Sequence, residues 1–259
     1  GGHPQLTAAK VVSLDQRGWP KDALIEDFSG TPSEAIELTR AEARRRLLED
    51  ASEHGRAMLK RLGCIMFKFD RPSAIAIAAL DPSIKEPSVS LDLLTGPWIE
   101  KVPSAPGYFR LSPLLSGLQE DLGAETIQNV QVGYLVSTLN RGPIPYEALD
   151  SVFWTAFVSK QSWFFSKFFE KSLSFDEDTH KAIAVKLGGL VYLRTDQMLL
   201  PEDPGTSHIL RILQIDVAAL NGEKTLFQPI ALAAMREAMA VEHEELKNAF
   251  TLMALLKIL

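Results

Sequence analysis

The amino-acid sequence predicts a mostly α-helical fold that contains one short β-hairpin. Apolar residues recur at helical spacing through most of the 259 residues, and strand-like alternation is rare and brief. Two β-prone segments, residues 96–102 and 107–111, flank Pro103-Ser-Ala-Pro106, which is typical of a hairpin connection. From Glu125 to the end, helical patterns follow one another with short breaks at 142–143, 172–175, 201–205 and 221–222. These observations predict a run of helices, a hairpin and then a helical array.

Several helices are expected before the hairpin. Apolar periodicity and breaker residues place them at 6–16, 34–50, 58–62, 72–80 and 89–94. The run from Cys64 to Asp70 is short and apolar, so a helix end and a short strand both remain open there. In a winged-helix domain, helices are likewise followed by a two-stranded hairpin. We therefore expect a winged-helix-like domain at residues 33–122.

The C-terminal part, residues 123–259, is expected to form helical repeats. Ser112-Pro-Leu-Leu opens a helix before it, because serine suits an N-cap and proline suits a first turn. Helix pairs then begin near Thr126, Gln161 and Ser207, and their period of about 35 to 45 residues falls in the range of TPR and HEAT arrays. The TPR consensus is not matched, so the prediction is an irregular α-solenoid with TPR-like pairs.

The composition is that of an ordinary globular protein, with 46% hydrophobic and 23% charged residues. The net charge is −6 and the acidic residues are spread along the chain, which argues against sequence-independent nucleic-acid binding. Apolar runs such as Ile75–Leu80 are far shorter than the roughly 20 residues that span a bilayer, and no signal peptide is recognisable. A single cysteine, Cys64, excludes an intramolecular disulfide and a cysteine-based zinc site. We expect a cytoplasmic protein without membrane contact.

The sequence contains no active-site signature, and no catalytic residue is nominated. It has no Gly-x4-Gly-Lys-[Ser/Thr] phosphate loop, no Gly-x-Gly-x-x-Gly, no Gly-x-Ser-x-Gly and no His-Glu-x-x-His. His243 lies among Glu242, Glu244 and Glu245, but one helix supplies too few converging ligands for a metal. An exposed, charged helix face is the preferred interpretation. We expect this chain neither to be an enzyme nor to hold a metal.

Eight aromatic residues are concentrated between Phe153 and Phe169. Several are spaced i and i+4, which places rings on common helix faces and favours burial between two consecutive helices. The phenylalanines of the second helix are expected to span more than one face, so part of the cluster is also a candidate partner-binding patch. This candidate patch consists of Trp163, Phe164, Phe165 and Phe168.

Three short motifs carry a family resemblance. They are Gly1-Gly-His-Pro-Gln-Leu6, Trp98-Ile-Glu-Lys101 and Tyr108-Phe-Arg-Leu-Ser-Pro-Leu-Leu115. The first resembles the Gly-x-Pro motif of STAND-class signalling NTPases, the NB-ARC and NACHT relatives of the AAA+ ATPases. The other two resemble the winged-helix domain that follows this motif. The resemblance implies that residues 1–32 are the tail of an AAA+-type helical subdomain.

The resemblance also implies where nucleotide contacts lie. Gly2 and Pro4 match the first motif, whose proline packs against the adenine of ATP or ADP in the intact parent protein. Many NB-ARC proteins also carry Met-His-Asp after the second wing strand, and its histidine contacts the β-phosphate. Ser112 stands at that position here, so the phosphate contact is not implied for this chain. The resemblance covers residues 1–122, and the remainder resembles helical repeats only in general terms.

Two functions of different class follow. The resemblance implies a regulatory relay within a STAND-type ATPase, which couples nucleotide state to a helical-repeat sensor and to protein partners or self-association. The alternative is a helical scaffold that binds proteins or peptides without nucleotide. The chain lacks an initiator Met and stops at Leu259 within a helical pattern, so a longer parent protein is expected, and a phosphate loop upstream of Gly1 would favour the relay.

Two further functions rank below these. Winged-helix DNA binding is disfavoured because residues 88–94 carry Asp92 and no arginine, and because the expected wing tip is uncharged. A stand-alone enzyme ranks last, since no nucleophile and base can be nominated from their spacing.

Overall fold

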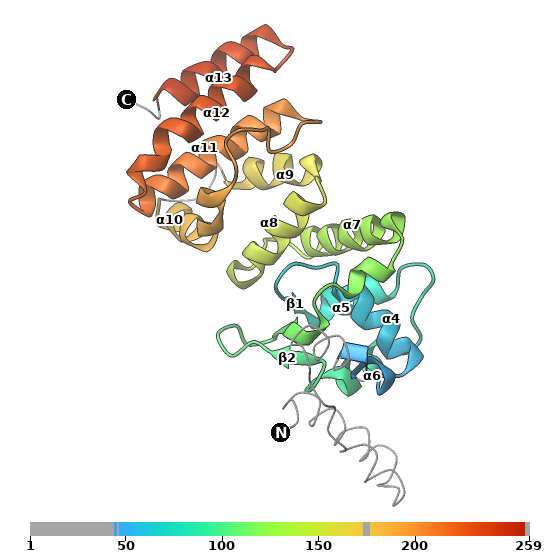
Figure 1. The fold of residues 1–259 in the computed structure, drawn as a ribbon. Coiled ribbons are helices and arrows are strands. Elements are labelled where there is room, and N and C mark those ends of the chain that lie inside the picture. The colour runs from blue at the N-terminus through green and yellow to red at the C-terminus, as the bar shows by residue number, and fades with distance from the viewer. Residues whose placement is uncertain (1–43, 46, 173–176, 257–259) are drawn as a thin grey trace, which may run out of the picture. The chain divides into compact units, whose positions relative to one another are not determined.

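A computed structural model describes residues 44, 45, 47–172 and 177–256 (Figure 1). The described residues are mostly helical, and their strands form one three-stranded antiparallel sheet, which confirms the predicted fold class. The chain divides into two compact units, Gly1–Thr155 and Ala156–Leu259. Within the described part of the chain, no helix combines the length and apolar character needed to cross a membrane. The expected helix at 6–16 and most of the one at 34–50 lie outside the described residues.

The first unit begins with helical residues at 44, 45 and 47–49 and then has the element order of a winged-helix domain. The order is α4 (Glu53–Leu62), β1 (Phe69–Asp70), α5 (Arg71–Ala78), α6 (Pro87–Leu94), β2 (Ile99–Lys101) and β3 (Tyr108–Leu111). The sheet order is β1-β3-β2, so the first strand pairs with the far strand of the hairpin. The expected winged-helix-like arrangement is therefore present.

Strand β1 resolves the alternative that the sequence left open between a helix end and a strand. Phe69 pairs with Phe109 and Asp70 with Tyr108, so the last two residues of the apolar run are a strand. Asp70 also ends the strand, because its Oδ1 accepts a hydrogen bond of 3.0 Å from the Ser73 amide and caps α5. A two-residue strand thus leads directly into a helix.

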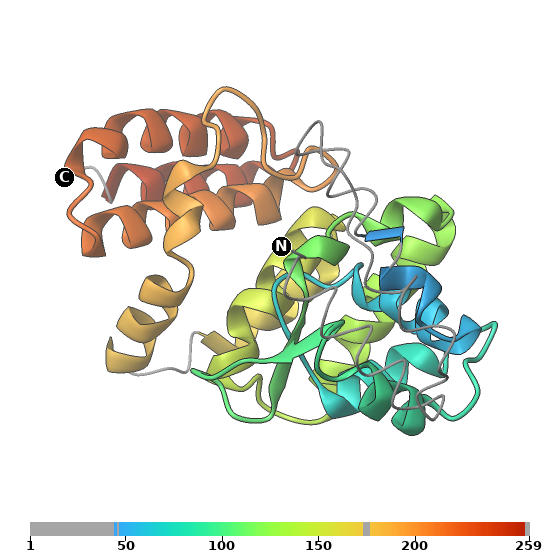
Figure 2. The same ribbon diagram turned by 60° about the horizontal axis from the view of Figure 1, so that its bottom comes forward.

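The hairpin forms where the sequence predicts it, with strands shorter than the β-prone segments (Figure 2). Ile99 pairs with Leu111 and Lys101 with Phe109. The tip at 102–107 closes with a 2.9 Å hydrogen bond from the Val102 amide to the Tyr108 carbonyl. After β3, the predicted helix is only one short turn, η1 (Pro113–Leu115), followed by η2 (Leu118–Asp121).

A buried arginine stabilises the centre of the first unit. Arg61 on α4 is only 5% exposed and donates to the carbonyls of Ile77 at 2.8 Å and Leu80 at 3.0 Å, where α5 ends. It also donates to Ala78 and Pro82. Cations are favoured at helix C-termini because the last carbonyls carry partial negative charge and lack partners within the helix. The side chain therefore joins α4 to the end of α5.

Helix α7 (Ala124–Asn140) also belongs to the first unit, as do η3 (Tyr146–Ala148) and α8 (Leu149–Val158) as far as Thr155. Arg141, at the end of α7, bonds the Asp70 carboxylate and lies 2.7 Å from Ser73 Oγ. Lys68 Nζ lies 2.7 Å from Asp150 Oδ2. These bonds attach α7 and the start of α8 to the winged-helix-like elements. The sequence analysis had assigned both helices to the repeat domain at residues 123–259.

The second unit is a stack of helices. Its elements are α9 (Ser162–Ser172), α10 (Glu177–Lys186), η4 (Gly188–Tyr192), α11 (Pro204–Leu220), η5 (Lys224–Leu226), α12 (Phe227–Met239) and α13 (Glu244–Leu256). Helix α12 packs against both α11 and α13, and Figure 1 shows the three side by side. Four alanines of α12 are buried: Ala231, Ala233, Ala234 and Ala238. Small side chains let helix backbones approach closely, which produces this helical-repeat-like packing.

Candidate interaction surfaces

The residues nominated from sequence fall in different places. Gly2 and Pro4, the expected adenine-side contacts, lie outside the described residues. His243 and its glutamate neighbours are exposed, as the charged-face interpretation expects. Among the residues that the structure describes, no group of three or more His, Cys, Asp or Glu side chains is placed to hold a metal ion.

The aromatic candidates are mostly buried rather than displayed. Phe164 and Phe165 are 0% exposed and Phe168 is 5% exposed, so the expectation of an exposed patch is wrong for these three. Their positions i, i+1 and i+4 share one face of α9, and the rings of Phe164 and Phe168 stack at 6.2 Å. Trp163 is 38% exposed, and its Nε1 donates to Gln161 Oε1 at 2.7 Å. The cluster is therefore core packing, with Trp163 at its edge.

Helix α6 presents an apolar outer face. Val89 is 51% exposed and Leu93 is 49% exposed, and their spacing of four residues puts them on the same side of the helix. Leu91 and Leu94 are buried on the opposite side. The sequence of α6 contains no lysine or arginine. In winged-helix DNA-binding proteins the corresponding helix meets DNA, whereas here the exposed side chains suit contact with apolar surface.

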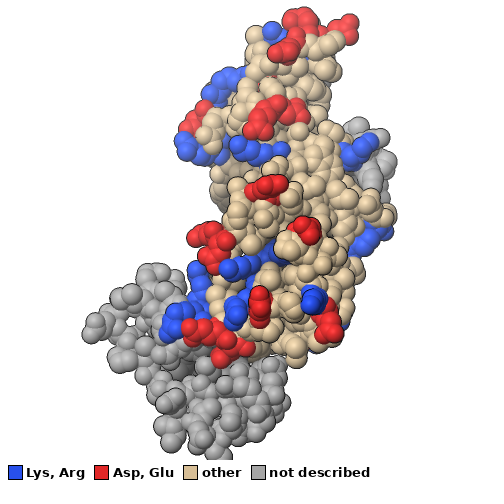
Figure 3. All heavy atoms as spheres, turned by 90° about the vertical axis from the view of Figure 1, so that its right-hand side faces the viewer, with Lys and Arg blue, Asp and Glu red and all other residues tan. Residues whose placement is uncertain are grey.

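Both arginines beside α6 and in the hairpin are paired with carboxylates. Arg71 forms an ion pair with Asp92, with Nη2 to Oδ2 at 2.9 Å, and this guanidinium holds the pKa of the Asp92 carboxyl below its usual range. Arg110 on β3 bonds Glu100 on β2 at 2.9 Å. On the face shown in Figure 3, basic and acidic side chains of the described residues are interspersed. This arrangement lacks the unbroken positive surface on which phosphate backbones bind.

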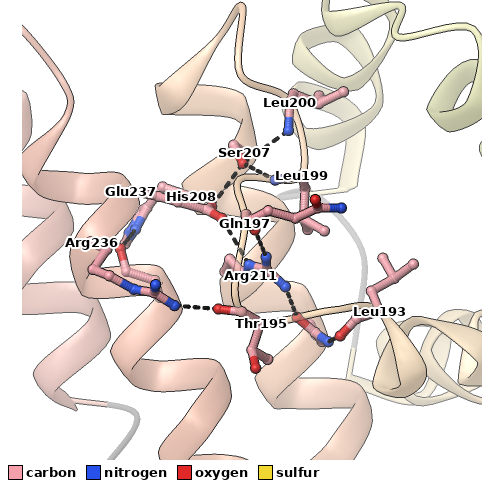
Figure 4. A network of polar contacts seen from close by, with 12 residues as sticks. Leu193, Thr195, Gln197, Leu199, Leu200, Ser207, His208, Arg211, Arg236 and Glu237 are labelled. Atoms are coloured by element: carbon pink, nitrogen blue, oxygen red, sulfur yellow. Dashed lines mark hydrogen bonds and ion pairs between the residues drawn. The ribbon is translucent and has the colours of Figure 1, made fainter.

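A buried network of polar side chains occupies the second unit (Figure 4). Arg211 on α11 is 0% exposed and Glu237 on α12 is 2% exposed, and Arg211 Nε donates to Glu237 Oε1 at 2.9 Å. Arg211 also donates to Gln214 Oε1 at 2.8 Å and to the Gln197 carbonyl at 2.6 Å. Burial lowers the pKa of Arg211, and the adjacent Glu237 carboxylate opposes this effect. Each of the three guanidinium nitrogens of this buried cation thus donates a hydrogen bond.

The network fixes the irregular connection at residues 193–203. Ser207 Oγ accepts hydrogen bonds from the amides of Leu199 at 3.0 Å and Leu200 at 3.1 Å, and it donates to Glu237 Oε2 at 2.8 Å. The side-chain Nε2 of Gln214 donates to the Leu193 carbonyl at 3.1 Å, and the Arg236 side chain donates to the carbonyl of Thr195 (Figure 4). Helices α11 and α12 therefore position a loop whose own backbone forms no regular structure.

Strongly exposed side chains lie directly before this loop and at its start. Tyr192 is 78% exposed, and the side chains of Arg194 and Asp196 are 71% and 62% exposed. Large exposed aromatic residues on loops held by a rigid scaffold are typical of protein-binding surfaces. The loop is the second candidate interaction surface, after the outer face of α6.

His208 lies beside the network without joining it. Its Nδ1 lies 2.9 Å from the Ala234 carbonyl, and its ring stacks on Phe250 of α13 at 4.6 Å. A carbonyl only accepts, so Nδ1 carries the proton in the neutral ring. Nε2 is buried and has no hydrogen-bond partner among the described residues. Burial lowers the pKa of His208, because the charged ring is kept from water, and the Ala234 carbonyl and the Glu237 carboxylate oppose this effect.

The spacing of polar residues in the sequence indicates this network, although no catalytic or metal-site motif does. Ser207, Arg211 and Gln214 are spaced by four and three residues, so three polar residues share a single face of α11. Glu237 lies in the alanine-rich segment of α12. Polar residues at core spacing on two consecutive helices predict a buried polar network, whereas catalytic and metal-site signatures do not describe it.

Comparisons with known proteins found no similar protein. No protein-family model, no curated protein and no solved structure matches the chain.

Proposed function

We propose that the chain is a regulatory relay module of a STAND-type signalling NTPase, in which the winged-helix-like elements dock on other protein domains. The observation that carries the proposal is the outer face of α6. The elements from α4 to β3 have winged-helix order, yet Val89 and Leu93 make the exposed side of the third helix apolar. An exposed apolar face that packs on a partner surface gains stability in proportion to the area removed from water.

The proposal favours protein contact over nucleic-acid contact for a specific reason. Arg71 beside α6 and Arg110 in the hairpin already pair with carboxylates, and Lys85 and Lys101 are the other exposed basic side chains nearby. Binding to phosphates would require these ion pairs to break, and α6 contributes no further cation. Docking on a protein surface leaves both ion pairs intact.

In the relay, α6 contacts a neighbouring nucleotide domain more strongly in one nucleotide state than in the other. ATP or ADP is held by the intact parent protein, with Gly2 and Pro4 on the adenine side. Because ligand binding shifts a two-state equilibrium only through differential contacts, the docked α6 face and the bound nucleotide must stabilise each other. The second unit then supplies the surface for protein partners or self-association.

Nucleotide binding tests this proposal. ATP and ADP affinities are measured for the chain and for a version extended at its N-terminus through any phosphate loop that the gene encodes. We expect binding only by the extended protein, and weaker binding after Pro4→Ala. Val89→Glu should lower the affinity for the docked-state nucleotide by at least about fivefold, the lower end of typical coupling. The matched control is Val185→Glu on α10, where the side chain is 66% exposed.

Two results would overturn the relay. One is the absence of nucleotide binding by both proteins. The other is an equal response to Val89→Glu and Val185→Glu, which would mean that the face of α6 has no special role.

A helical interaction scaffold is the second candidate function, and the anchored loop favours it. Tyr192 is 78% exposed beside a loop that five side-chain hydrogen bonds to its backbone hold in place. A scaffold without nucleotide function predicts that Tyr192→Ala weakens partner binding while the extended protein binds no nucleotide. Partner binding can be measured by cross-linking of the purified protein followed by identification of the joined peptides.

A further inference from the structure

A half-open hollow lies in the second unit, between the loop at 193–203 and α12. It is lined by Asp196, Gln197 and Met198 of the loop and by Ala233, Arg236 and Glu237 of α12. Ala233 is 1% exposed and Glu237 is 2% exposed, so these two form the floor. The loop side chains and Arg236 remain accessible and form the sides. A partner can therefore reach the sides of the hollow, but not its floor.

An exposed stripe of α12 runs past the hollow. Leu232, Arg236 and Met239 are spaced by four and three residues, so they lie on the same side of the helix. Leu232 is 53% exposed and Met239 is 61% exposed. Apolar side chains thus flank the arginine of the hollow on both sides. Large apolar side chains grouped in this way on a surface mark a site of interaction.

The charge of Arg236 is the one left unbalanced at the hollow among the residues that the structure describes. Arg194 bonds Asp196, with Nε to Oδ1 at 3.0 Å, and Arg211 is paired with Glu237 at 2.9 Å. Arg236 forms no such ion pair within the described part of the chain. In a protein of net charge −6, this positive site favours a partner that brings a carboxylate.

The arginine and the loop are already held in place. The guanidinium of Arg236 donates to the carbonyl of Thr195, and Figure 4 shows the side chain extended toward this loop residue. The same loop is anchored by Ser207, Arg211 and Gln214 of α11. A surface that is ordered before binding loses less conformational entropy when a partner docks. The sides of the hollow are therefore preorganised.

We propose that the hollow and the stripe of α12 bind a short peptide segment of a partner protein that carries a carboxylate beside an apolar side chain. The carboxylate pairs with Arg236, and the apolar side chain covers Leu232 or Met239. The inference rests on the proposed role of the second unit as a surface for protein partners. Nothing in it involves α6 or a nucleotide.

The test begins with a phage-displayed library of random peptides applied to the whole chain. The library is first passed over the Leu232→Glu variant, which removes peptides that bind to other surfaces. We expect the remaining peptides that bind the unchanged chain to be enriched in Asp or Glu next to apolar residues. The tightest of them is synthesised in two forms, one with its acidic residue and one with the corresponding amide residue.

The affinities of the two peptides are measured for the unchanged chain and for Arg236→Gln. On the unchanged chain the amide peptide should bind about tenfold more weakly, the effect of one hydrogen bond to a charged group. Arg236→Gln should bind both peptides equally, because the partner of the carboxylate is gone. If the variant also loosens the loop, both peptides weaken together, and the comparison still isolates the pair.

Controls separate this surface from a general loss of fold. Leu252→Glu on α13, where the side chain is 57% exposed, should bind the acidic peptide as the unchanged chain does. Melting temperatures are measured for all variants before any peptide is added. We expect Leu232→Glu to melt within a few degrees of the unchanged chain, since surface substitutions usually change stability little.

Four results would overturn the proposal. No peptide passes the selection, or those that pass lack acidic residues. The acidic and amide peptides differ by the same factor on both proteins. Sedimentation shows that the chain dimerises and that Leu232→Glu separates the copies, in which case the surface joins two copies of this chain. None of these results changes nucleotide binding by the extended protein, so failure here is distinguishable from failure of the relay.

Discussion

Each unit of this protein buries an arginine, and the two arginines are satisfied in different ways. Arg61 in the first unit makes its hydrogen bonds to backbone carbonyls at the end of α5. Arg211 in the second unit bonds the Glu237 carboxylate and the Gln214 side chain in addition to one loop carbonyl. A cation held by carbonyls depends on one residue, whereas an ion pair fails when either partner is lost or loses its charge. The second unit should therefore be the more sensitive to mutation and to acid.

The largest effect is expected from Glu237→Gln, which removes the charge that balances Arg211. Breaking a buried ion pair on one side leaves an uncompensated charge and typically costs about 3–5 kcal/mol. Urea unfolding measures the loss, and hydrogen exchange should locate it in α11, α12 and the loop at 193–203. The same change at Glu245, which is exposed on α13, is the control. A cost below about 1 kcal/mol would show that the pair does not hold the second unit together.

A smaller loss is expected from Arg61→Met, which keeps much of the side-chain volume but leaves the carbonyls at the end of α5 without a donor. Buried unsatisfied carbonyls cost about 1–3 kcal/mol, and because backbone movement can admit water, we expect a total of about 2–3 kcal/mol in the first unit. Urea unfolding with hydrogen exchange again assigns the change to a unit. Arg110→Met, at a half-exposed ion pair, should change stability by less than about 1 kcal/mol. Equal costs at the two arginines would refute the role given to Arg61.

Acid should lower the stability of the second unit more than that of the first, because of His208. Its pKa is lowered in the folded state, so the unfolded chain binds this proton more readily. The stabilising contribution is fully present above the unfolded value of about 6.5 and is lost as pH falls below it, by at most about 1.4 kcal/mol per pH unit. In the first unit, the Arg141 hydrogen bonds hold the pKa of Asp70 below its usual range, so that contribution is lost only below a pH of about 4.

Hydrogen exchange between pH 7.5 and 5.0 measures this difference, with the rates corrected for the intrinsic effect of pH. Protection should decrease in α11, α12 and α13 and stay constant in α4 to β3. His208→Gln should flatten the response of the second unit, and His243→Gln, at an exposed position, should not. A parallel loss of protection in both units would contradict the assignment to His208.

The smallest losses of stability are expected from substitutions at two helix caps, both of which are aspartates. Asp203 caps α11 by accepting from the Thr206 amide at 3.0 Å, and Asp203→Ala should cost about 1 kcal/mol. Asp70 caps α5 with the same geometry but also bonds Arg141, so Asp70→Ala should cost more, about 2 kcal/mol. Thermal unfolding of both variants gives the ranking. The reverse order would mean that the Asp70–Arg141 pair contributes nothing.

The sequence predicts local structure well and side-chain burial less well. The hairpin, α5 and α6 follow from proline positions and β-prone residues, which act within a few residues of themselves. The sequence could not decide between a helix end and a strand at β1, because two residues carry almost no periodicity. The assignment depends on pairing with β3, about forty residues later. The same limit left Phe164, Phe165 and Phe168 open between core packing and a partner-binding patch, since which face of α9 is covered depends on distant segments. Arg61 reads as an ordinary surface residue until its partners are known, whereas the spacing of Arg211 with Ser207 and Gln214 on α11 does indicate a buried network.

The junction between β1 and α5 limits how the length of the chain can change. Phe69 is held by the sheet, Asp70 both pairs with Tyr108 and caps the helix, and Arg71 is already helical. One inserted residue here would turn α5 by about 100° around its axis and remove Arg61 from its carbonyl acceptors. An insertion at the hairpin tip would disturb no such contact, whereas the connection after α5 carries Leu80 and Pro82, two acceptors of Arg61. Length differences that accumulate during evolution of related chains belong at the hairpin tip, and this junction keeps a constant spacing.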